Sequence, residues 1–232
     1  MSELLECRDL TKKYGNVLAL NNVSFTLERG RIVGLLGPNA SGKTTLIKLI
    51  NGLLTPTSGE VLINGEKPGV KSKLSIAYLP DTTFLSDFMN VKQLINYYGD
   101  FYSNFEKEKA YDMLKHLNIA ENMKLKAMSK GTKEKVQLIL TMSRKADLYC
   151  LDEPIGGVDP ASRDYILNTI LNNYNEEGSI LISTHLISDI EQILDEVLLI
   201  QYGNLYAHKS VDEIREEHGI SVDGYFREVF RC

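Results

Sequence analysis

One segment of this 232-residue sequence carries the residue types needed to hold a phosphate group. It matches the pattern G-x-x-x-x-G-K followed by Ser or Thr, and it consists of Gly37, Pro38, Asn39, Ala40, Ser41, Gly42, Lys43 and Thr44, with Thr45 next. Glycines let backbone N–H groups approach phosphate oxygens, because no side chain stands in the way. Lys43 supplies charge for the β- and γ-phosphates, and the Thr44 hydroxyl can bind Mg²⁺. The segment therefore predicts a nucleotide site.

The segments on either side of this loop fit the prediction. The apolar run from Ile32 to Leu36 predicts a buried strand that ends at Gly37. From Lys43 to Leu53 the apolar residues recur at helical spacing. We therefore expect the loop to open a helix whose positive N-terminal end faces the anion.

Two carboxylates follow a second apolar run. Residues 148–151 predict a buried strand, and Asp152 and Glu153 come directly after it. Asp152 is expected to bind Mg²⁺ through its water shell, and Glu153 to orient or deprotonate the attacking water. An apolar run ending in two acids can also be a strand that meets solvent, so the catalytic interpretation depends on the phosphate loop.

A third segment, Met128 to Thr132, has Ser129 and Gly131 at the start of a predicted helix, where a serine can also be a simple cap. Here the sequence resembles the ATP-binding cassette (ABC) family, whose signature Leu-Ser-Gly-Gly-Gln shares this serine and glycine. The Ser-Lys-Gly form is similar to a subset found in bacterial exporters with type-2 membrane subunits. The resemblance implies that Ser129 and Gly131 complete the ATP site of a second cassette.

The resemblance implies roles for three more residues. Tyr14 matches the aromatic residue that stacks on adenine, although a tyrosine at the corner of a strand can be structural. Asp159, in Gly157-Val158-Asp159-Pro160, stands at the acidic position of the D-loop. His185, in Ser183-Thr184-His185, matches the switch histidine that contacts the γ-phosphate. Together with Lys43 and Glu153, His185 completes the predicted catalytic set.

Asp81 departs from the family pattern, which usually has Gln at this loop. We expect Asp81 to touch Mg²⁺ through a water, as a third metal-site residue beside Thr44 and Asp152. Two alternatives are that Asp81 positions the loop against the membrane subunit, or that it only caps the helical insert after Pro80.

The order of elements predicts an α/β fold with a phosphate-loop ATPase core. Alternating strands and helices indicate a mostly parallel sheet, preceded by N-terminal antiparallel strands. Helical periodicity in residues 82–145 predicts an inserted helical sub-domain, and residues 203–232 a short C-terminal tail, all within one ABC ATPase domain spanning residues 1–232. Ser210 and Glu213 form a capping-box pattern for a further helix.

Composition narrows the classes of partner. The net charge of −5 argues against nucleic-acid binding by charge, and no apolar run reaches the roughly 18–20 residues that span a bilayer. The N-terminus lacks a signal-peptide pattern, which favours the cytoplasm. Cys7, Cys150 and Cys232 show no zinc or redox spacing and are expected to be reduced thiols.

The resemblance implies an ATP- and Mg²⁺-dependent ATPase that drives a transporter whose membrane-spanning subunits are separate chains. Each ATP would lie between two cassettes, so the chain is expected to pair with a second copy of itself or with a related cassette. It would sit on the cytoplasmic face of the membrane through its partner, and the short tail favours export. The alternative is a soluble ABC ATPase for assembly, such as iron–sulfur cluster assembly.

Overall fold

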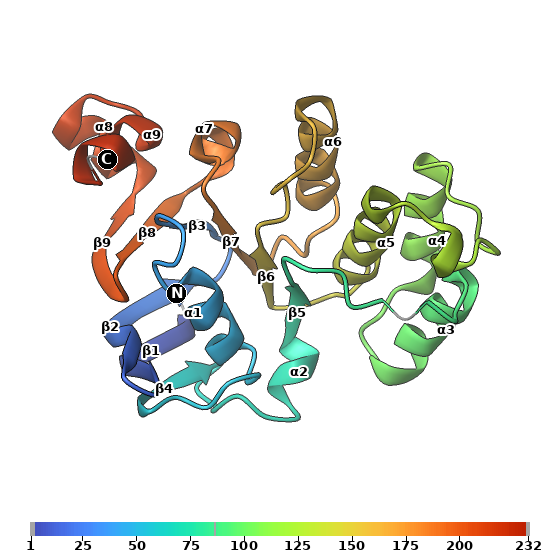
Figure 1. Ribbon diagram of the computed structural model, residues 1–232, viewed down its shortest axis with the longest axis horizontal. Coiled ribbons are helices and arrows are strands. Elements are labelled where there is room, and N and C mark those ends of the chain that lie inside the picture. Colours follow the sequence, from blue (N-terminus) through green and yellow to red (C-terminus); the bar gives the residue numbers. More distant parts are fainter. Residues whose placement is uncertain (1–2, 86, 231–232) are drawn as a thin grey trace.

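The computed structural model describes residues 3–85 and 87–230. The strands are β1 Glu3–Tyr14, β2 Val17–Glu28, β3 Ile32–Leu36, β4 Ser58–Ile63, β5 Ile76–Leu79, β6 Leu148–Asp152, β7 Ser179–Thr184, β8 Glu196–Gln201 and β9 Asn204–Ser210. The helices are α1 Lys43–Ile50, α2 Ser72–Ser75, α3 Val91–Phe101, α4 Lys107–His116, η1 Leu125–Ala127, α5 Lys130–Met142, α6 Pro160–Leu171, α7 Ile187–Ile190, η2 Glu191–Ile193, α8 Val211–His218 and α9 Val222–Val229. Figure 1 shows them in an elongated molecule, with α3, α4 and α5 at one end.

The central sheet has the strand order β5-β6-β7-β3-β8-β9. Its first five strands are parallel neighbours, and only the edge strand β9 runs antiparallel, to β8. A second, antiparallel sheet has the order β2-β1-β4. The predicted α/β class, with N-terminal antiparallel strands and a mostly parallel sheet, is confirmed. Because β3, β6 and β7 are parallel, their carboxyl ends meet at one edge of the sheet.

Two hydrophobic cores cover the two faces of the central sheet. Along β6, Leu148 and Cys150 join the core shared with α1, while Tyr149 and Leu151 join the core shared with α5 and α6. This alternation is the period of two that a strand imposes on its side chains. In Figure 1, α1 lies between the two sheets, and α6 and α7 lie beyond the opposite face of the central sheet. The strand ends that carry the candidate site are therefore held rigidly from both sides.

The segment between β5 and β6 holds α3, α4, η1 and α5. The first of these helices begins at a capping box, in which Asn90 and Gln93 exchange side-chain and backbone hydrogen bonds. On α5, Val136 and Ile139 are buried in the core on the α6 side of the sheet. The predicted helical insert thus consists of these helices, tied to the sheet through α5.

Residues 204–230, predicted as part of a tail, form β9, α8 and α9. The expected capping box of Ser210 and Glu213 at the start of α8 is confirmed. Val222 and Tyr225 of α9 are buried in the main core. Cys7 and Cys150 are free, buried thiols, as expected, whereas Cys232 lies outside the described residues. None of the described helices is long and apolar enough to cross a lipid bilayer.

Candidate nucleotide-binding and catalytic site

The phosphate loop joins the end of β3 to the start of α1, as predicted, and its glycines are required by close approaches of backbone. A Cβ on Gly37 would lie 2.2 Å from the Ile200 carbonyl oxygen, and one on Gly42 would lie 2.7 Å from the Ala19 carbonyl oxygen. Gly42 also has a φ of 114°, which L side chains rarely adopt. The loop can therefore keep this conformation only with glycine at these two positions.

Lys43 is buried at the base of the loop. Its Nζ donates hydrogen bonds to the carbonyl oxygens of Gly37, at 2.8 Å, and Pro38, at 3.1 Å. Burial lowers the pKa of Lys43, and the charges of Glu153 and Asp152 oppose that shift. The ammonium group is thus hydrogen-bonded to backbone carbonyl oxygens. An anionic phosphate group can replace these oxygens as its partner.

Asp152 is fully buried, and its two carboxylate oxygens differ in their contacts. Oδ1 accepts hydrogen bonds from the Ser183 hydroxyl at 2.6 Å and from the Thr44 hydroxyl at 3.2 Å. Among the described residues, Oδ2 has no hydrogen-bond partner although it is buried. Burial raises the pKa of Asp152, and the two hydroxyl contacts partly offset that rise. A buried, unpartnered carboxylate oxygen is costly unless something else satisfies it.

These oxygens suit the Mg²⁺ ion that the family implies. Carboxylate and hydroxyl oxygens are hard ligands, and Mg²⁺ commonly binds one or two of them together with waters and substrate phosphates. In the described part of the chain, no group of three or more His, Cys, Asp or Glu side chains converges as a metal site. Asp152 and Thr44 thus fit a Mg²⁺ ion whose other ligands come from water and phosphate.

Glu153 follows β6 in a strained backbone conformation, with a φ of 50°. Its N–H is held by the Ser183 backbone oxygen at 3.0 Å and the Ser183 hydroxyl at 3.1 Å. Its carboxylate Oε2 lies 3.0 Å from Nδ1 of His185, which follows the adjacent strand β7. With Glu153 ionised, Nδ1 carries the proton and donates it to this hydrogen bond. Two of the three predicted catalytic residues, Glu153 and His185, are therefore a hydrogen-bonded pair.

A pocket of about 620 Å³ opens over the phosphate loop. The predicted residues that line it are Asn39, Ala40, Ser41, Gly42, Lys43, Thr44, Thr45, Asp81 and Glu153. Sequence reasoning missed the others, which are Val17, Leu18, Ala19, Tyr202 and Gly203. Val17 and Leu18 could have been noticed as apolar residues next to Tyr14 and the Gly15-Asn16 turn, whereas Tyr202 stands in no recognisable pattern.

Asp81 lies on the wall of this pocket and is exposed. Its charge is close enough to contribute to the raised pKa of Asp152. The alternative that Asp81 caps the helical insert is wrong, because the first helix after it is α3, which begins at Val91 with Asn90 as its cap. The described residues between Asp81 and Asn90 form no helix.

The remaining predicted residues lie outside the pocket. Tyr14 pairs with Val17 across the β1–β2 hairpin, and its exposed ring has the Lys12 Nζ 5.3 Å from its centre. Asp159 caps α6 by accepting from the Ser162 N–H. Ser129 and Gly131 lie at the start of α5, which Ser129 caps by accepting from the Thr132 N–H. One chain by itself does not place Ser129, Gly131 or Asp159 in the pocket over the phosphate loop.

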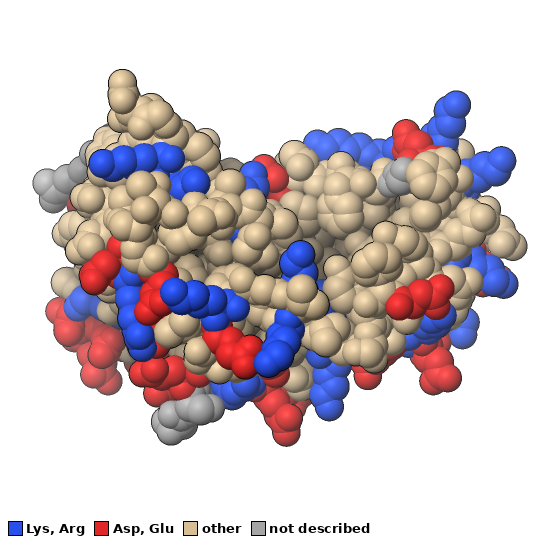
Figure 2. Space-filling model, turned by 90° about the horizontal axis from the view of Figure 1, so that it is seen from below, with Lys and Arg blue, Asp and Glu red and all other residues tan. Residues whose placement is uncertain are grey.

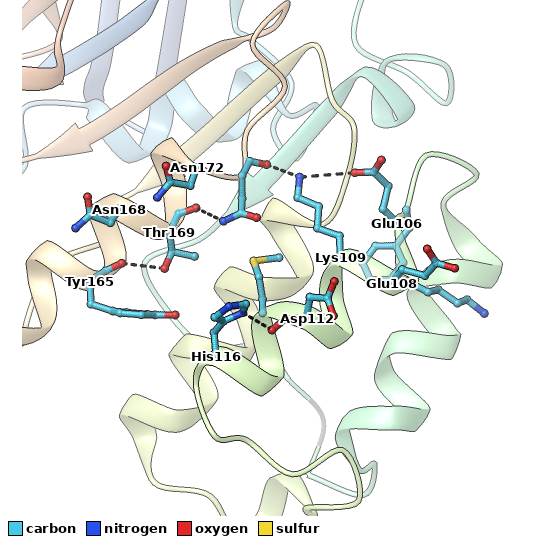
Figure 3. Close-up of a pocket in the computed structure, with 13 residues that line it drawn as sticks. Glu106, Glu108, Lys109, Asp112, His116, Tyr165, Asn168, Thr169 and Asn172 are labelled. Carbon is cyan, nitrogen blue, oxygen red and sulfur yellow. Dashed lines mark hydrogen bonds and ion pairs between the residues drawn. The ribbon is translucent and has the colours of Figure 1, made fainter.

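A larger hollow, of about 1020 Å³, lies between α4 and α6 (Figure 3). Of the two lysines that line it, Lys109 is already engaged, since its Nζ donates to the Asn173 carbonyl oxygen at 2.5 Å and lies 3.6 Å from Glu106. His116 likewise bonds the Asp112 carbonyl oxygen on its own helix. None of the predicted site residues lines this hollow, so its size does not mark the site of catalysis.

Comparison with known proteins decides the family. The family model described as ABC transporter matches residues 20–156. This chain belongs to the ABC transporter family. The ABC transporter ATP-binding protein YtrB of Bacillus subtilis is 33% identical over 93% of this chain and 75% of its own length. The SkfA peptide export ATP-binding protein SkfE of the same species is 32% identical over 93% of this chain and 92% of its own length.

Solved structures agree with this assignment. The structure of an ATP-binding subunit of an ABC transporter superposes with a TM-score of 0.86 at 29% identity, covering 97% of this chain and 99% of the other. As a member of the ABC family, this chain is an ATP-binding and ATP-hydrolysing transporter subunit. These relatives give no support to the alternative of iron–sulfur cluster assembly.

Proposed function

We propose that this ABC cassette drives a membrane exporter from the cytoplasmic face of the membrane, with ATP hydrolysed between two cassettes. The observation that carries the catalytic part is the arrangement of the Glu153–His185 pair and the Asp152–Thr44 contact around one phosphate loop. Export is supported by the similarity to SkfE, whose name describes peptide export.

The residues of the loop and the strand ends have separate roles in this proposal. Lys43 leaves the carbonyl oxygens of Gly37 and Pro38 and binds the β- and γ-phosphates. The N–H groups of residues 39–45 and the N-terminal end of α1 bind the same phosphates. Glu153 orients and deprotonates the attacking water, while the hydrogen bond from His185 fixes its carboxylate. His185 also contacts the γ-phosphate, and Tyr14 stacks on the adenine.

Asp152 and Thr44 hold Mg²⁺, and Asp81 contacts it through a water. When bound, Mg²⁺ neutralises charge on the β- and γ-phosphate oxygens. The unpartnered Oδ2 of Asp152 supports this assignment, because a buried carboxylate oxygen needs a partner.

A second cassette completes each site. Ser129 and Gly131 are exposed, and among the described atoms nothing lies within 4 Å of a Cβ built on Gly131. The fold of this chain therefore gives no reason for glycine there, whereas close approach of an ATP molecule held by another cassette does. The paired arrangement is two-fold symmetric if the partner is a second copy. Asp159 lies in the D-loop at the same interface.

The membrane subunit is expected to dock beside the segment that follows Asp81. A groove of about 350 Å³ lies between the central sheet and the helical insert, and Pro80 and Phe84 line it. Exposed apolar side chains border it or lie on neighbouring segments, among them Leu53, Leu74, Phe84, Phe88 and Phe101. Figure 2 views the molecule from below and shows a broad area with few charges over the half that holds the insert. The 80–84 segment thus connects the phosphate-loop pocket to this groove.

Purification of the chain from detergent-solubilised membranes of its own cells tests the partner. We expect a protein with several membrane-spanning segments, identified by mass spectrometry, to copurify with the wild type and not with Phe84→Asp. Tyr206→Asp, an exposed aromatic position on β9, is the matched control and should retain it. Copurification with Phe84→Asp at the wild-type level would contradict the docking site.

Direction of transport needs a vesicle assay with that partner. Labelled peptides should accumulate with ATP in inside-out membrane vesicles and not in right-side-out vesicles loaded with ATP. Lys43→Ala vesicles should accumulate none, since the phosphate contact is lost. Accumulation only in right-side-out vesicles would indicate import and contradict the proposal.

A further inference from the structure

Tyr202 occupies an unusual backbone conformation in the turn between β8 and β9. Tyr202 has a φ of 47° and Gly203 a φ of 76°, so both central residues of this two-residue turn are in the left-handed region. Such turns strongly favour Gly, which has no Cβ to clash, and Asn or Asp, whose short polar side chains can hydrogen-bond locally. A bulky aromatic residue at the first of these positions therefore calls for an explanation.

The strained positions of this chain point to one place. Among the described residues, positive φ at residues other than glycine occurs at Asp9, Asn22, Ala40, Asn64, Asn118, Glu153 and Tyr202. Four of these are Asn or Asp, which tolerate the conformation. The other three, Ala40, Glu153 and Tyr202, all line the phosphate-loop pocket. Backbone strain of this kind gathers at functional sites, and two of the three already have a role here.

The turn is fastened to the phosphate loop. The Gly203 N–H donates to the Ser41 carbonyl oxygen at 2.9 Å, and the Asn21 N–H donates to the Gly203 carbonyl oxygen at 2.8 Å. A Cβ on Gly203 would lie 2.7 Å from the Ala19 carbonyl oxygen, so the two backbones are in close contact. The position of Tyr202 relative to the loop is thus fixed before any ligand binds.

The ring of Tyr202 is left largely uncovered, with 80% of the residue exposed. Val17, which is 67% exposed, and Leu18 line the same pocket and are also apolar. An exposed apolar wall next to a phosphate site fits a ligand that is anionic at one end and flat and apolar at the other. ATP is such a ligand, with its triphosphate as the anionic end and its base as the flat end. Aromatic rings stack on every type of nucleic-acid base.

We propose that Tyr202 is a nucleotide-contacting residue whose ring packs against the base and ribose of ATP bound at the phosphate loop. This inference rests on the proposed nucleotide site and adds a second aromatic side chain to it. Tyr14 lies on the hairpin that also carries Val17, so the two tyrosines approach the nucleoside from different elements. The strained turn is the means by which Tyr202 is presented.

Binding measured by calorimetry without hydrolysis, with ATP and with inorganic tripolyphosphate as probes, separates the nucleoside from the phosphates. Tyr202→Ala and Tyr202→Asn should weaken ATP binding by about five- to a hundredfold, the range found for base–aromatic stacking, and leave tripolyphosphate binding unchanged. Tyr202→Phe should bind ATP as the wild type does. Tyr206→Ala, which changes the exposed tyrosine of β9 outside the pocket, is the matched control and should also be unchanged.

Thermal unfolding without nucleotide gives a second readout. Because Asn tolerates the left-handed region, Tyr202→Asn should raise the unfolding temperature while it weakens ATP binding. If Tyr202 served only to stabilise the turn, Tyr202→Asn would lower the unfolding temperature. That result would overturn the inference.

Two binding results would also overturn it. The first is an unchanged affinity of Tyr202→Ala for ATP. If ATP-driven dimers were lost at the same time, the ring would contact a second copy of the chain rather than the nucleotide. The second is an equal loss for ATP and tripolyphosphate. Lys43→Ala must weaken binding of both probes, and if it does not, the proposed nucleotide site fails rather than the assignment of Tyr202.

Discussion

At the scale of single residues, the three carboxylates around the phosphate loop differ in their access to water. Asp152 is buried, Glu153 is partly buried and Asp81 is exposed. A buried carboxylate that accepts two hydroxyl hydrogen bonds has a fixed position, whereas an exposed one keeps its hydration. This difference supports a fixed place for Asp152 beside the Mg²⁺ ion and its water shell, and contact through a water for Asp81.

Asp81→Asn keeps the size of the side chain and removes its charge. We expect the Mg²⁺ concentration for half-maximal ATP hydrolysis to rise about two- to fivefold, which corresponds to about 0.4–1 kcal/mol for an exposed charge contact. A Mg²⁺ titration of ATPase activity in the complex with the membrane subunit measures it. Unchanged Mg²⁺ dependence with transport uncoupled from hydrolysis would assign Asp81 to positioning its loop instead.

Sequence motifs identified most residues of the pocket, because the phosphate loop and the Asp152-Glu153 pair are defined by local spacing. The burial of these residues and their hydrogen-bond partners could not be predicted from the sequence. The Ser183 hydroxyl, for example, contacts Asp152 only because β6 and β7 are neighbours in the sheet. The alternative role of Asp81 as a helix cap was wrong, because the helix starts farther along the chain, at the Asn90 capping box. Tyr202 escaped notice since a single turn residue forms no pattern.

At the scale of elements, Arg163 of α6 joins two segments that flank the site. Its Nε donates to the Val158 carbonyl oxygen at 3.1 Å in the predicted D-loop, and its Nη1 donates to Asp189 at 2.7 Å on α7. Helix α7 begins two residues after His185. The predicted D-loop and the segment that follows His185 are thus held to each other by one side chain.

Breaking this contact should disturb the position of His185 more than it disturbs nucleotide binding. For Arg163→Ala and for Asp189→Ala we expect kcat to fall about two- to fivefold, equivalent to about 0.4–1 kcal/mol, with the KM for ATP nearly unchanged. The double variant should be no worse than either single one, since the two residues act through one contact.

Arg29→Ala is the matched control for this pair. It removes the similarly exposed ion pair of Arg29 with Asp147, which lies at the opposite end of β6 from Asp152. Equal losses of kcat in Arg163→Ala and Arg29→Ala would mean that the first contact serves stability alone.

Elements with strong local signals were the ones that sequence predicted best. Strand β3 and the start of α1 were placed to the residue, although the predicted helix ran to Leu53 and α1 ends at Ile50, and the capping box of α8 was found. Strand β9 was taken as part of a tail although exposed positions alternate along it, at Asn204, Tyr206 and His208, as they do in an edge strand. Helix α9 has only eight residues, and its burial depends on the core it meets, which no local pattern reveals.

At the scale of the whole molecule, one chain holds the two halves of a site that do not meet. The phosphate loop lies at the carboxyl edge of the central sheet, and the Ser129-Gly131 segment begins α5 in the helical insert. Neither of these two signature residues lines the phosphate-loop pocket. This separation supports the proposal that a second cassette completes the site.

Ser129→Arg places a long, charged side chain at the point where the second cassette would approach. In the Glu153→Gln background, which preserves bound ATP, we expect this change to block ATP-driven dimers while ATP binding to the monomer stays largely intact. Light scattering with and without ATP measures the dimer, and Lys130→Arg, the exposed neighbour, serves as the control. Normal ATP-dependent dimers of Ser129→Arg would contradict the composite site.

The central claim, that Glu153 acts on the attacking water in an ATP-hydrolysing site, is tested most directly by turnover of Glu153→Gln. This change removes the charge and keeps the shape, so ATP should still bind while hydrolysis falls by about 10²–10⁴-fold. Glu216→Gln, on the exposed face of α8, should hydrolyse ATP at the wild-type rate. Single-turnover hydrolysis of prebound ATP in the presence of the membrane subunit gives the rate. We expect bound, intact ATP for Glu153→Gln, whereas turnover near the wild-type rate would show that Glu153 does not act on the attacking water.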